Sequence, residues 1–224
     1  PKELISDVNS ILEIDESDRV LGHELFQGGD KEVYNMSTDI FVVDTPYLIE
    51  KLEEEAAKEE PRKLRYVLRD LAVAENAFAY EYTGYLSNIH SVKAYFDANL
   101  DMLESEKFYK LFAPNQKVYT KVKNEEPTYY ATSSDVKVSQ FASGSIVRGK
   151  VEHSVVSRNV DLAEGSSVGH SVLFPRVKVG KGATVEYAIV DKGVEIAEGV
   201  TIRGTENNPV VIRKGSVVTE DIVR

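Results

Sequence analysis

The C-terminal third of the chain contains a short tandem repeat, which constrains the fold more than any other feature of the sequence. Residues 161–177, 178–194 and 195–211 align without gaps. Aliphatic side chains recur in register, and glycine holds one fixed position. The columns are Leu162, Val179 and Ile196; Val168, Val185 and Ile202; Leu173 and Val190; and Gly165, Gly182 and Gly199. A unit this short cannot bury its own apolar face, so successive units must stack into one continuous core.

The spacing within each unit predicts the shape of the stack. Apolar residues lie about six positions apart, which gives three short strands per coil. Glycine suits the corner where the backbone turns tightly. The repeat therefore predicts a triangular parallel β-helix. Residues 144–160 fit the same frame with Val151 and Val156 in column, residues 212–218 begin another coil, and residues 205–209 resemble a small insertion.

Composition excludes several classes of function. The net charge of −10 argues against nucleic-acid and membrane partners, because such surfaces need clustered lysine and arginine. The chain has no cysteine, which fits a cytoplasmic protein and excludes thiolate chemistry. We find no signal peptide and no apolar run long enough to span a membrane. Pro1 opens the sequence within a stretch that already resembles structured protein, so we expect a fragment of a longer chain.

The first half of the chain has the pattern of an α/β layer. Residues 39–43 and 77–82 resemble strands, and amphipathic helices are expected after the N-cap Thr45, from Leu64 and after the N-cap Ser91. Residues 116–135 contain the proline, asparagine and serine typical of a linker. At 224 residues we predict two domains. An α/β domain over residues 1–115 is joined by this linker to a β-helix over residues 136–224.

Two groups of side chains in the repeat are candidates for chemistry. His153 and His170 are separated by one repeat length and therefore stack in neighbouring coils. A histidine there suits the general base of a hexapeptide-repeat acyltransferase, and the alternative that we favour is an outward polar ladder on a flat face, continued by Tyr187. The second group is a candidate anion or effector site, for which scattered surface ion pairs are the alternative. Its members are Arg148, Lys150, Arg158, Arg176 and Lys178.

The segment from Glu81 to Leu103, EYTGYLSNIHSVKAYFDANLDML, is similar to a segment of bacterial glucose-1-phosphate adenylyltransferases (ADP-glucose pyrophosphorylases). Residues 84–103 match it without gaps. Residues 37–41 resemble a Ser-Met-Gly-Ile-Tyr strand of that family, and residues 189–196 resemble its β-helix repeats. The resemblance covers about residues 30–224. It implies part of a Rossmann-like nucleotidyltransferase domain followed by a left-handed parallel β-helix of hexapeptide repeats.

Within that segment the chain departs from the family's Trp-Arg-Asp-Val-Gly motif. Asn88 replaces the aspartate that, in catalytic members, helps to hold the metal at the reacting phosphates. An amide is a poor substitute for a carboxylate beside Mg²⁺. Ser87 replaces the arginine, and His90 replaces the glycine. Mg²⁺ is thus implied for the family's reaction, but we expect this fragment to have no catalytic residue, no metal site and no cofactor, with Ser37 and Asn88 as remnants of the substrate pocket.

These departures resemble the regulatory, catalytically degenerate (GlgD-type) subunits of the family. The leading hypothesis is therefore the C-terminal part of such a subunit, inactive alone and acting in assembly and allosteric control of bacterial glycogen synthesis. The resemblance implies a catalytic subunit as partner, an oligomer and a phosphorylated effector. The alternatives are an active subunit that tolerates Asn88, a hexapeptide-repeat acyltransferase and a pure scaffold.

Overall fold

The computed structural model describes residues 5, 9–112, 117–121 and 123–224. Contacts divide the chain into two compact units, Pro1–Thr83 and Gly84–Arg224, each with its own buried apolar residues. Residue 115, where we predicted a domain boundary from the composition of the following segment, lies outside the described residues, and that division stays a prediction. The helices after Gly84 belong to the same compact unit as the repeat.

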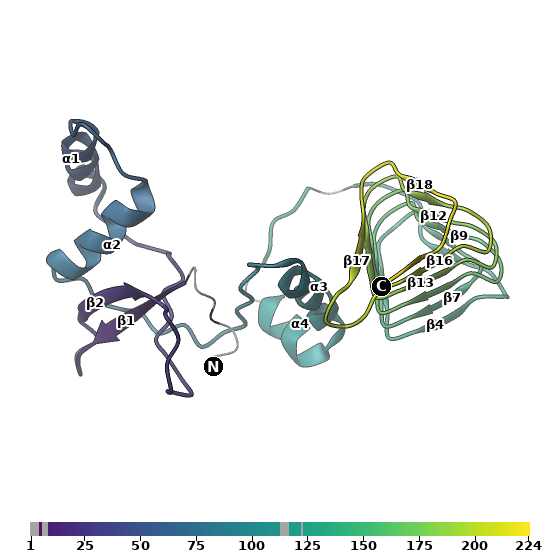
Figure 1. The fold of residues 1–224 in the computed structure, drawn as a ribbon, viewed down its shortest axis with the longest axis horizontal. Coiled ribbons are helices and arrows are strands. Elements are labelled where there is room, and N and C mark those ends of the chain that lie inside the picture. The colour runs from purple at the N-terminus through teal and green to yellow at the C-terminus, as the bar shows by residue number, and fades with distance from the viewer. Residues whose placement is uncertain (1–4, 6–8, 113–116, 122) are drawn as a thin grey trace. The chain divides into compact units, whose positions relative to one another are not determined.

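The second unit contains a parallel β-solenoid in which each full coil contributes one strand to each of three sheets (Figure 1). We name the sheets in the order in which the chain passes them. Face 1 contains β3 (Tyr129–Tyr130), β6 (Ile146–Val147), β9 (Asp161–Leu162), β12 (Lys178–Val179), β15 (Glu195–Ile196) and β18 (Val217–Val218). Face 2 contains β4 (Asp135–Lys137), β7 (Lys150–Glu152), β10 (Ser167–Gly169), β13 (Thr184–Glu186), β16 (Thr201–Arg203) and β19 (Ile222–Val223). Face 3 contains β5 (Gln140–Phe141), β8 (Val155–Val156), β11 (Val172–Leu173), β14 (Ala188–Val190) and β17 (Val210–Ile212).

The predicted apolar columns form the core of this solenoid. Leu162, Leu173 and Ile202, one from each face, are completely buried. Each column continues through the neighbouring coils, and the buried members pack into one cluster. Burying a valine, leucine or isoleucine contributes about 1.5–3 kcal/mol, so the stacked columns hold the coils together. The predicted parallel β-helix is confirmed, although it begins at Tyr129, inside the segment predicted to be a linker.

The corners of the solenoid show where the repeat holds and where it changes. Gly165, Gly182 and Gly199 have φ between 65° and 73°, as expected for a tight corner that favours glycine. The coil before the repeat is shorter than predicted, because Asp161 pairs with Ile146, which lies less than one repeat length before it. In the last coil Val217 pairs with Glu195, which lies more than one repeat length before it, and this confirms an insertion near residues 205–209.

The first unit contains a hairpin and two helices. Strands β1 (Ser10–Ile14) and β2 (Val20–Leu25) pair antiparallel, and α1 (Thr45–Ala56) and α2 (Leu64–Ala74) follow. The N-cap of α1 is Asp44 and not the predicted Thr45, because the Asp44 carboxylate accepts a hydrogen bond from the backbone N–H of Tyr47. No helix in the part of the chain that the structure describes has the length and apolar character needed to cross a membrane.

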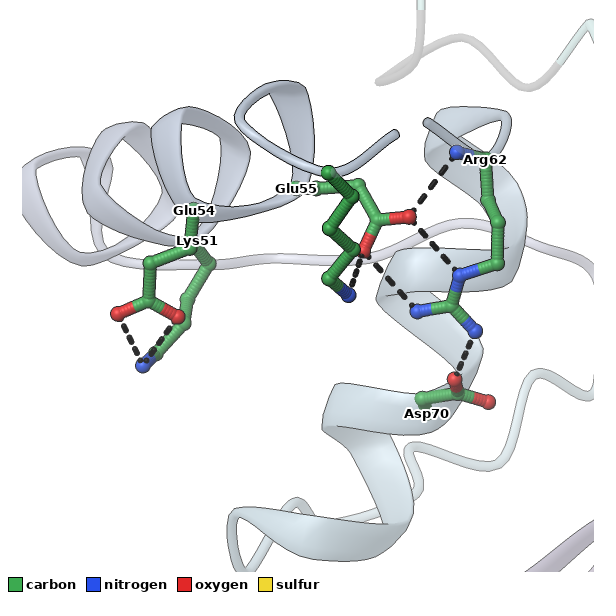
Figure 2. A network of polar contacts seen from close by, with 6 residues as sticks. Lys51, Glu54, Glu55, Arg62 and Asp70 are labelled. Carbon is green, nitrogen blue, oxygen red and sulfur yellow. Dashed lines mark hydrogen bonds and ion pairs between the residues drawn. The ribbon is translucent and has the colours of Figure 1, made fainter. Parts of the chain in front are cut away.

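An ion-pair network links the two helices (Figure 2). Glu55 is buried and accepts hydrogen bonds from the backbone N–H and guanidinium of Arg62 and from Lys58. Arg62 also donates to Asp70 on α2. Hydrogen bonds from Arg62, followed by those from Lys58, hold the pKa of Glu55 far below its usual value. One residue of the acidic run on α1, Glu55, therefore has a structural role.

The two strands predicted in this unit do not form. Ile40 and Val42 are 81% and 102% exposed, and residues 39–43 contain no strand. Tyr80 is 91% exposed, and residues 77–82 contribute only an isolated bridge between Phe78 and Arg19. A strand needs a hydrogen-bonded neighbour along its length. The described residues supply no such neighbour at residues 39–43, and at residues 77–82 they supply only the short contact with residues 18–20. The apolar pattern was read correctly, but the sheet that it requires is absent from the described part of this chain.

Candidate functional site

The segment that resembles the adenylyltransferases continues into a helical element packed on face 3. Its helices are α3 (Val92–Leu100), the short 3₁₀ helix η2 (Asp101–Leu103) and α4 (Ser105–Leu111). Ser91 caps α3 as predicted, because its hydroxyl accepts a hydrogen bond from the N–H of Ala94 at 3.0 Å. Figure 1 shows α3 and α4 beside the sheet that ends in β17.

An outward-facing apolar column on face 3 explains why α3 lies there. Val172 and Ile189 occupy paired outward positions on β11 and β14, yet they are only 2% and 6% exposed. Phe96 of α3 packs on both and is 1% exposed. Tyr95 stacks on Phe174 with ring centroids 6.5 Å apart. The helix therefore covers a second, external apolar surface of the solenoid.

Polar contacts attach the residues before and after α3. The hydroxyl of Tyr85 donates to Asp101 Oδ2 at 3.0 Å, and Lys107 Nζ donates to Asp101 Oδ1 at 2.6 Å. Burial, together with the bond to Asp101, raises the pKa of Tyr85. The amide of Gln140 on β5 donates to the backbone carbonyl of Met102 at 2.5 Å. Asp101 and Met102 thus connect the segment at Tyr85 to the first full coil.

The segment with the motif substitutions lies next to these contacts. Residues 85–90 contain neither helix nor strand, and the backbone N–H of His90 donates to the carbonyl of Asn88 at 3.1 Å. Ser87 and Asn88 are half-buried, whereas His90 is exposed. Contacts place this whole segment in the same unit as the solenoid.

Ser37, the other predicted remnant of a substrate pocket, lies in the first unit. Its backbone N–H donates to the carbonyl of Ser10 at 2.8 Å, and its hydroxyl accepts from the N–H of Asp39 at 3.2 Å. Asp39 in turn receives two hydrogen bonds from the guanidinium of Arg69. These contacts give Ser37 a local structural role, and its part in a pocket with Asn88 stays a prediction.

The side chains that the structure describes do not fit the Mg²⁺ that the family resemblance implies. Mg²⁺ is normally held by carboxylates together with substrate phosphates. Asn88 offers one neutral carbonyl oxygen, and the described residues contain no group of three carboxylate or histidine side chains arranged to hold a metal. The donor set is therefore insufficient, and we derive no chemical step through a metal bound by this chain.

The predicted basic cluster is dispersed over the solenoid. Four of its members pair with carboxylates: Arg148 with Asp161 at 2.6 Å, Lys150 with Glu152 at 3.1 Å, Arg158 with Glu125 at 3.4 Å, and Lys178 with Glu195 at 2.7 Å. Arg176 is exposed and makes no ion pair with the described residues. Its backbone N–H donates to the carbonyl of Arg158, so these two arginines lie at the same corner.

The distribution of these pairs limits what the cluster can do. Arg148 and Lys178 line a shallow groove of about 400 Å³ on face 1. Hydrogen bonds with Glu152 and Glu195 raise the pKa values of Lys150 and Lys178, so each ammonium is already matched by a carboxylate. An anion bound there has to displace that carboxylate. Binding of an anion at Arg158 and Arg176 stays a prediction.

The predicted ladder of His153, His170 and Tyr187 is present. The ring centroids are 5.0 Å apart between the histidines and 4.8 Å apart between His170 and Tyr187. The three residues have φ of 46°, 44° and 48°, so they lie at the corner between faces 2 and 3 and not on a flat face as predicted. The rings are half-buried; that of His170 stacks on Tyr187 and is tilted by 34° to that of His153, an arrangement that suits a structural ladder.

The residues that attach the helical element were not found from the sequence. Asp101 and Tyr85 lie 16 residues apart, and Gln140 lies 38 residues after Met102. Separations of this kind follow no periodic pattern, so the sequence did not predict these contacts. The outward column at Val155, Val172 and Ile189 recurs once per repeat, however, and its apolar character was available in the sequence.

Comparison with known proteins agrees with the fold and with the resemblance. Residues 121–223 match the family described as GlmU-like, C-terminal hexapeptide. The chain is 35% identical over 88% of its length to "Glycogen biosynthesis protein GlgD" of Bacillus subtilis, of which it covers 55%. It is 54% identical over 57% of its length to the GlgD protein of Geobacillus stearothermophilus, of which it covers 37%. It is 29% identical over 65% of its length to a glucose-1-phosphate adenylyltransferase of Clostridium acetobutylicum, of which it covers 39%. The chain thus spans about half the length of the Bacillus relative, or less of the others.

Proposed function

We propose that this chain, which belongs to the glucose-1-phosphate adenylyltransferase family, is part of a regulatory subunit in bacterial glycogen synthesis. The premise is that it aligns with GlgD proteins over most of its length. The observation that carries the proposal is the alignment with GlgD over 88% of the chain. Asn88 supports it, because the family motif has a carboxylate at that position. The role of this chain is assembly and allosteric control.

The family reaction joins ATP and glucose 1-phosphate to give ADP-glucose and pyrophosphate. Displacement at the α-phosphate requires positioned phosphates and compensation of their charge. The segment around Asn88 offers a neutral amide, a serine and a histidine in place of the motif's aspartate, arginine and glycine. It therefore lacks both the carboxylate that would hold a cation and the guanidinium that would face a phosphate. Catalysis is accordingly assigned to a separate adenylyltransferase chain.

The proposed partners follow from that assignment. They are a catalytic glucose-1-phosphate adenylyltransferase subunit in a shared cytoplasmic oligomer and a phosphorylated effector. Arg158 and Arg176 are the first residues to substitute in a search for the effector site, because they lie at one corner. Lys137→Ala is a matched control, because Lys137 is a basic residue on face 2 that pairs with Asp135 and lies outside the predicted cluster.

The test is ADP-glucose synthesis by the whole protein, alone and titrated into the adenylyltransferase of the same organism. We expect no turnover alone and stimulation in the mixture. Turnover alone would contradict the regulatory assignment. Absence of any effect in the mixture would leave a scaffold function.

A second candidate is an active subunit that tolerates the amide, favoured by the 29% identity to the Clostridium adenylyltransferase. It predicts that Asn88→Asp changes turnover of the whole protein little. The regulatory proposal instead predicts no turnover by the unsubstituted whole protein, and a strong rise in turnover with Asn88→Asp would support a degenerate site. Ser87→Ala is the matched control for an effect of any change in the segment.

A further inference from the structure

The segment at residues 85–90 is fixed to the solenoid although it has no regular structure of its own. Its position depends on Tyr85, whose hydroxyl donates to Asp101. A side-chain hydrogen bond with Ser87 also acts on the pKa of the Tyr85 hydroxyl, lowering it against the larger effect of burial. The phenol therefore links the segment that contains the motif substitutions, of which Tyr85 is part, to Asp101 of η2.

Asp101 is the centre of this arrangement because each of its two carboxylate oxygens has a different partner. Oδ2 accepts from Tyr85, and Oδ1 accepts from Lys107 of α4 at 2.6 Å. Lys107 also donates to Glu104 at 2.9 Å, and these two carboxylates raise the pKa of its ammonium. A charge-assisted bond on one oxygen fixes the carboxylate plane and so orients the other oxygen toward the phenol.

The adjacent residue joins this centre to the solenoid. The carbonyl of Met102 accepts a hydrogen bond from Gln140, which occupies the outward position of β5. The next outward residues on face 3 are Val155, Val172 and Ile189. Gln140 is thus a polar residue in this column, and its side-chain amide meets the backbone carbonyl of Met102.

We infer that Asp101 is a positioning residue, which holds the segment of Ser87 and Asn88 in place on the solenoid through Tyr85 on one side and the Met102–Gln140 bond on the other. A ligand or partner chain that shifts the first coils therefore shifts this segment with them. The regulatory meaning of that movement rests on the proposed function, whereas the attachment itself rests on the contacts of this chain.

The attachment is tested by spin labels on this chain. The chain has no cysteine, so Ile89→Cys and Lys181→Cys give two unique label positions, one on the segment and one on an exposed solenoid corner. Electron–electron double resonance measures the distance distribution between the labels. We expect a narrow distribution that at least doubles in width when Tyr85→Phe removes one hydroxyl or Asp101→Asn removes the charge.

Matched variants separate positioning from general destabilisation. Tyr109→Phe removes the same hydroxyl from a 64% exposed tyrosine of α4, and the width is expected to stay unchanged. The double variant of Tyr85→Phe with Asp101→Asn is expected to broaden the distribution no further than the more severe single variant, because both act on one bond. An unchanged width in both single variants, with the labelled chain folded, would overturn the inference.

A second measurement separates this inference from the proposed function. In the whole protein mixed with its adenylyltransferase, Asp101→Asn is expected to reduce stimulation by about fivefold or more, the lower end of a typical allosteric coupling. If the unsubstituted protein gives no stimulation, the proposed function fails and the distance measurement alone decides the attachment. If stimulation survives in a variant whose distances have broadened, the segment does not transmit the signal and the regulatory part of the inference is wrong.

Discussion

Replacing Phe96 with alanine tests whether α3 is held on face 3 by its apolar contacts. The ring is 1% exposed and packs on Val172 and Ile189. Truncation of a buried phenylalanine costs about 3–5 kcal/mol, the sum of the lost transfer free energy and the cavity left behind. α3 has 9 residues, too few for a stable isolated helix in water. We therefore expect the substitution to undock the helix and unfold it locally.

Native-state hydrogen exchange followed by mass spectrometry measures this effect. Since about 1.4 kcal/mol corresponds to a tenfold change, the loss predicts exchange that is about 100-fold faster or more at the amides of α3. The amides of β11 and β14 are expected to keep their protection, because the inward columns lose no contact. An increase below about tenfold at α3 would refute the packing argument. Equal acceleration in β11 would show that the solenoid and the helix unfold together.

Two controls make the comparison specific. Tyr109→Ala truncates a 64% exposed aromatic residue of α4, and the change in stability is expected to lie within about 0.5 kcal/mol. Ile189→Ala removes the other side of the contact with Phe96. Because the two side chains touch, the double variant is expected to cost less than the sum of the single costs, by about 0.5–3 kcal/mol.

Three further predictions concern the solenoid and the first unit. Gly180→Ala places a methyl group 2.7 Å from backbone atoms of the next coil, so we expect the free energy of unfolding, measured with a chemical denaturant, to fall by about 3 kcal/mol. In Gly182→Ala the methyl group meets no atom within 4 Å, but the residue has φ of +65°, so we expect the free energy of unfolding to fall by about 1–2 kcal/mol. Asparagine, which tolerates this φ, should be milder than alanine at Gly182 and no milder at Gly180; the reverse order would contradict the distinction. Leu173→Ala, in the fully buried interior, is expected to cost about 2–5 kcal/mol, and a loss below about 1 kcal/mol would mean that the column does not bear on stability. The pKa of Glu55 lies below its ordinary value of 4.5 because of Arg62, so the contribution of Glu55 to stability is complete above about pH 4.5 and is lost as the pH falls through the lowered folded-state pKa. The difference in melting temperature between the wild type and Glu55→Gln should therefore shrink in acid. A pH-independent difference would contradict this.

The interior of the solenoid was predictable because stacking leaves no freedom at inward positions. Leu162, Leu173 and Ile202 had to be buried once the repeat was recognised. The start of the solenoid was less predictable, since one coil is shorter than the repeat and strict application of the repeat misplaces its first strand. The coil is shortened near Gly149, where a Cβ atom would clash with the hydroxyl and carbonyl oxygens of Ser166. That reason for glycine depends on a neighbouring coil and is visible only in three dimensions.

The predicted strands failed for a different reason. Local pattern identified apolar segments at Ile40 and Tyr80, but a strand is completed by partners that the pattern does not contain. At the candidate site, resemblance singled out Asn88 by its chemistry, and no rule of spacing pointed to Tyr85 or Asp101. The hydrogen bond between them joins the residues before α3 to those after it, and it depends on where α3 ends.

The solenoid uses apolar columns for two purposes, and only burial in the folded chain separates them. The inward column of face 3 contains Leu173 and Val190, which would be buried in any solenoid with this repeat. The adjacent outward column contains Val172 and Ile189, which are buried in a cluster with Phe96 of α3. On face 1 the outward residues include Asp161, Lys178 and Glu195, which form ion pairs at the surface. An apolar outward column next to an apolar inward one therefore marks the face of such a solenoid that receives another element, and here that element is α3, which lies in the segment that resembles the adenylyltransferases.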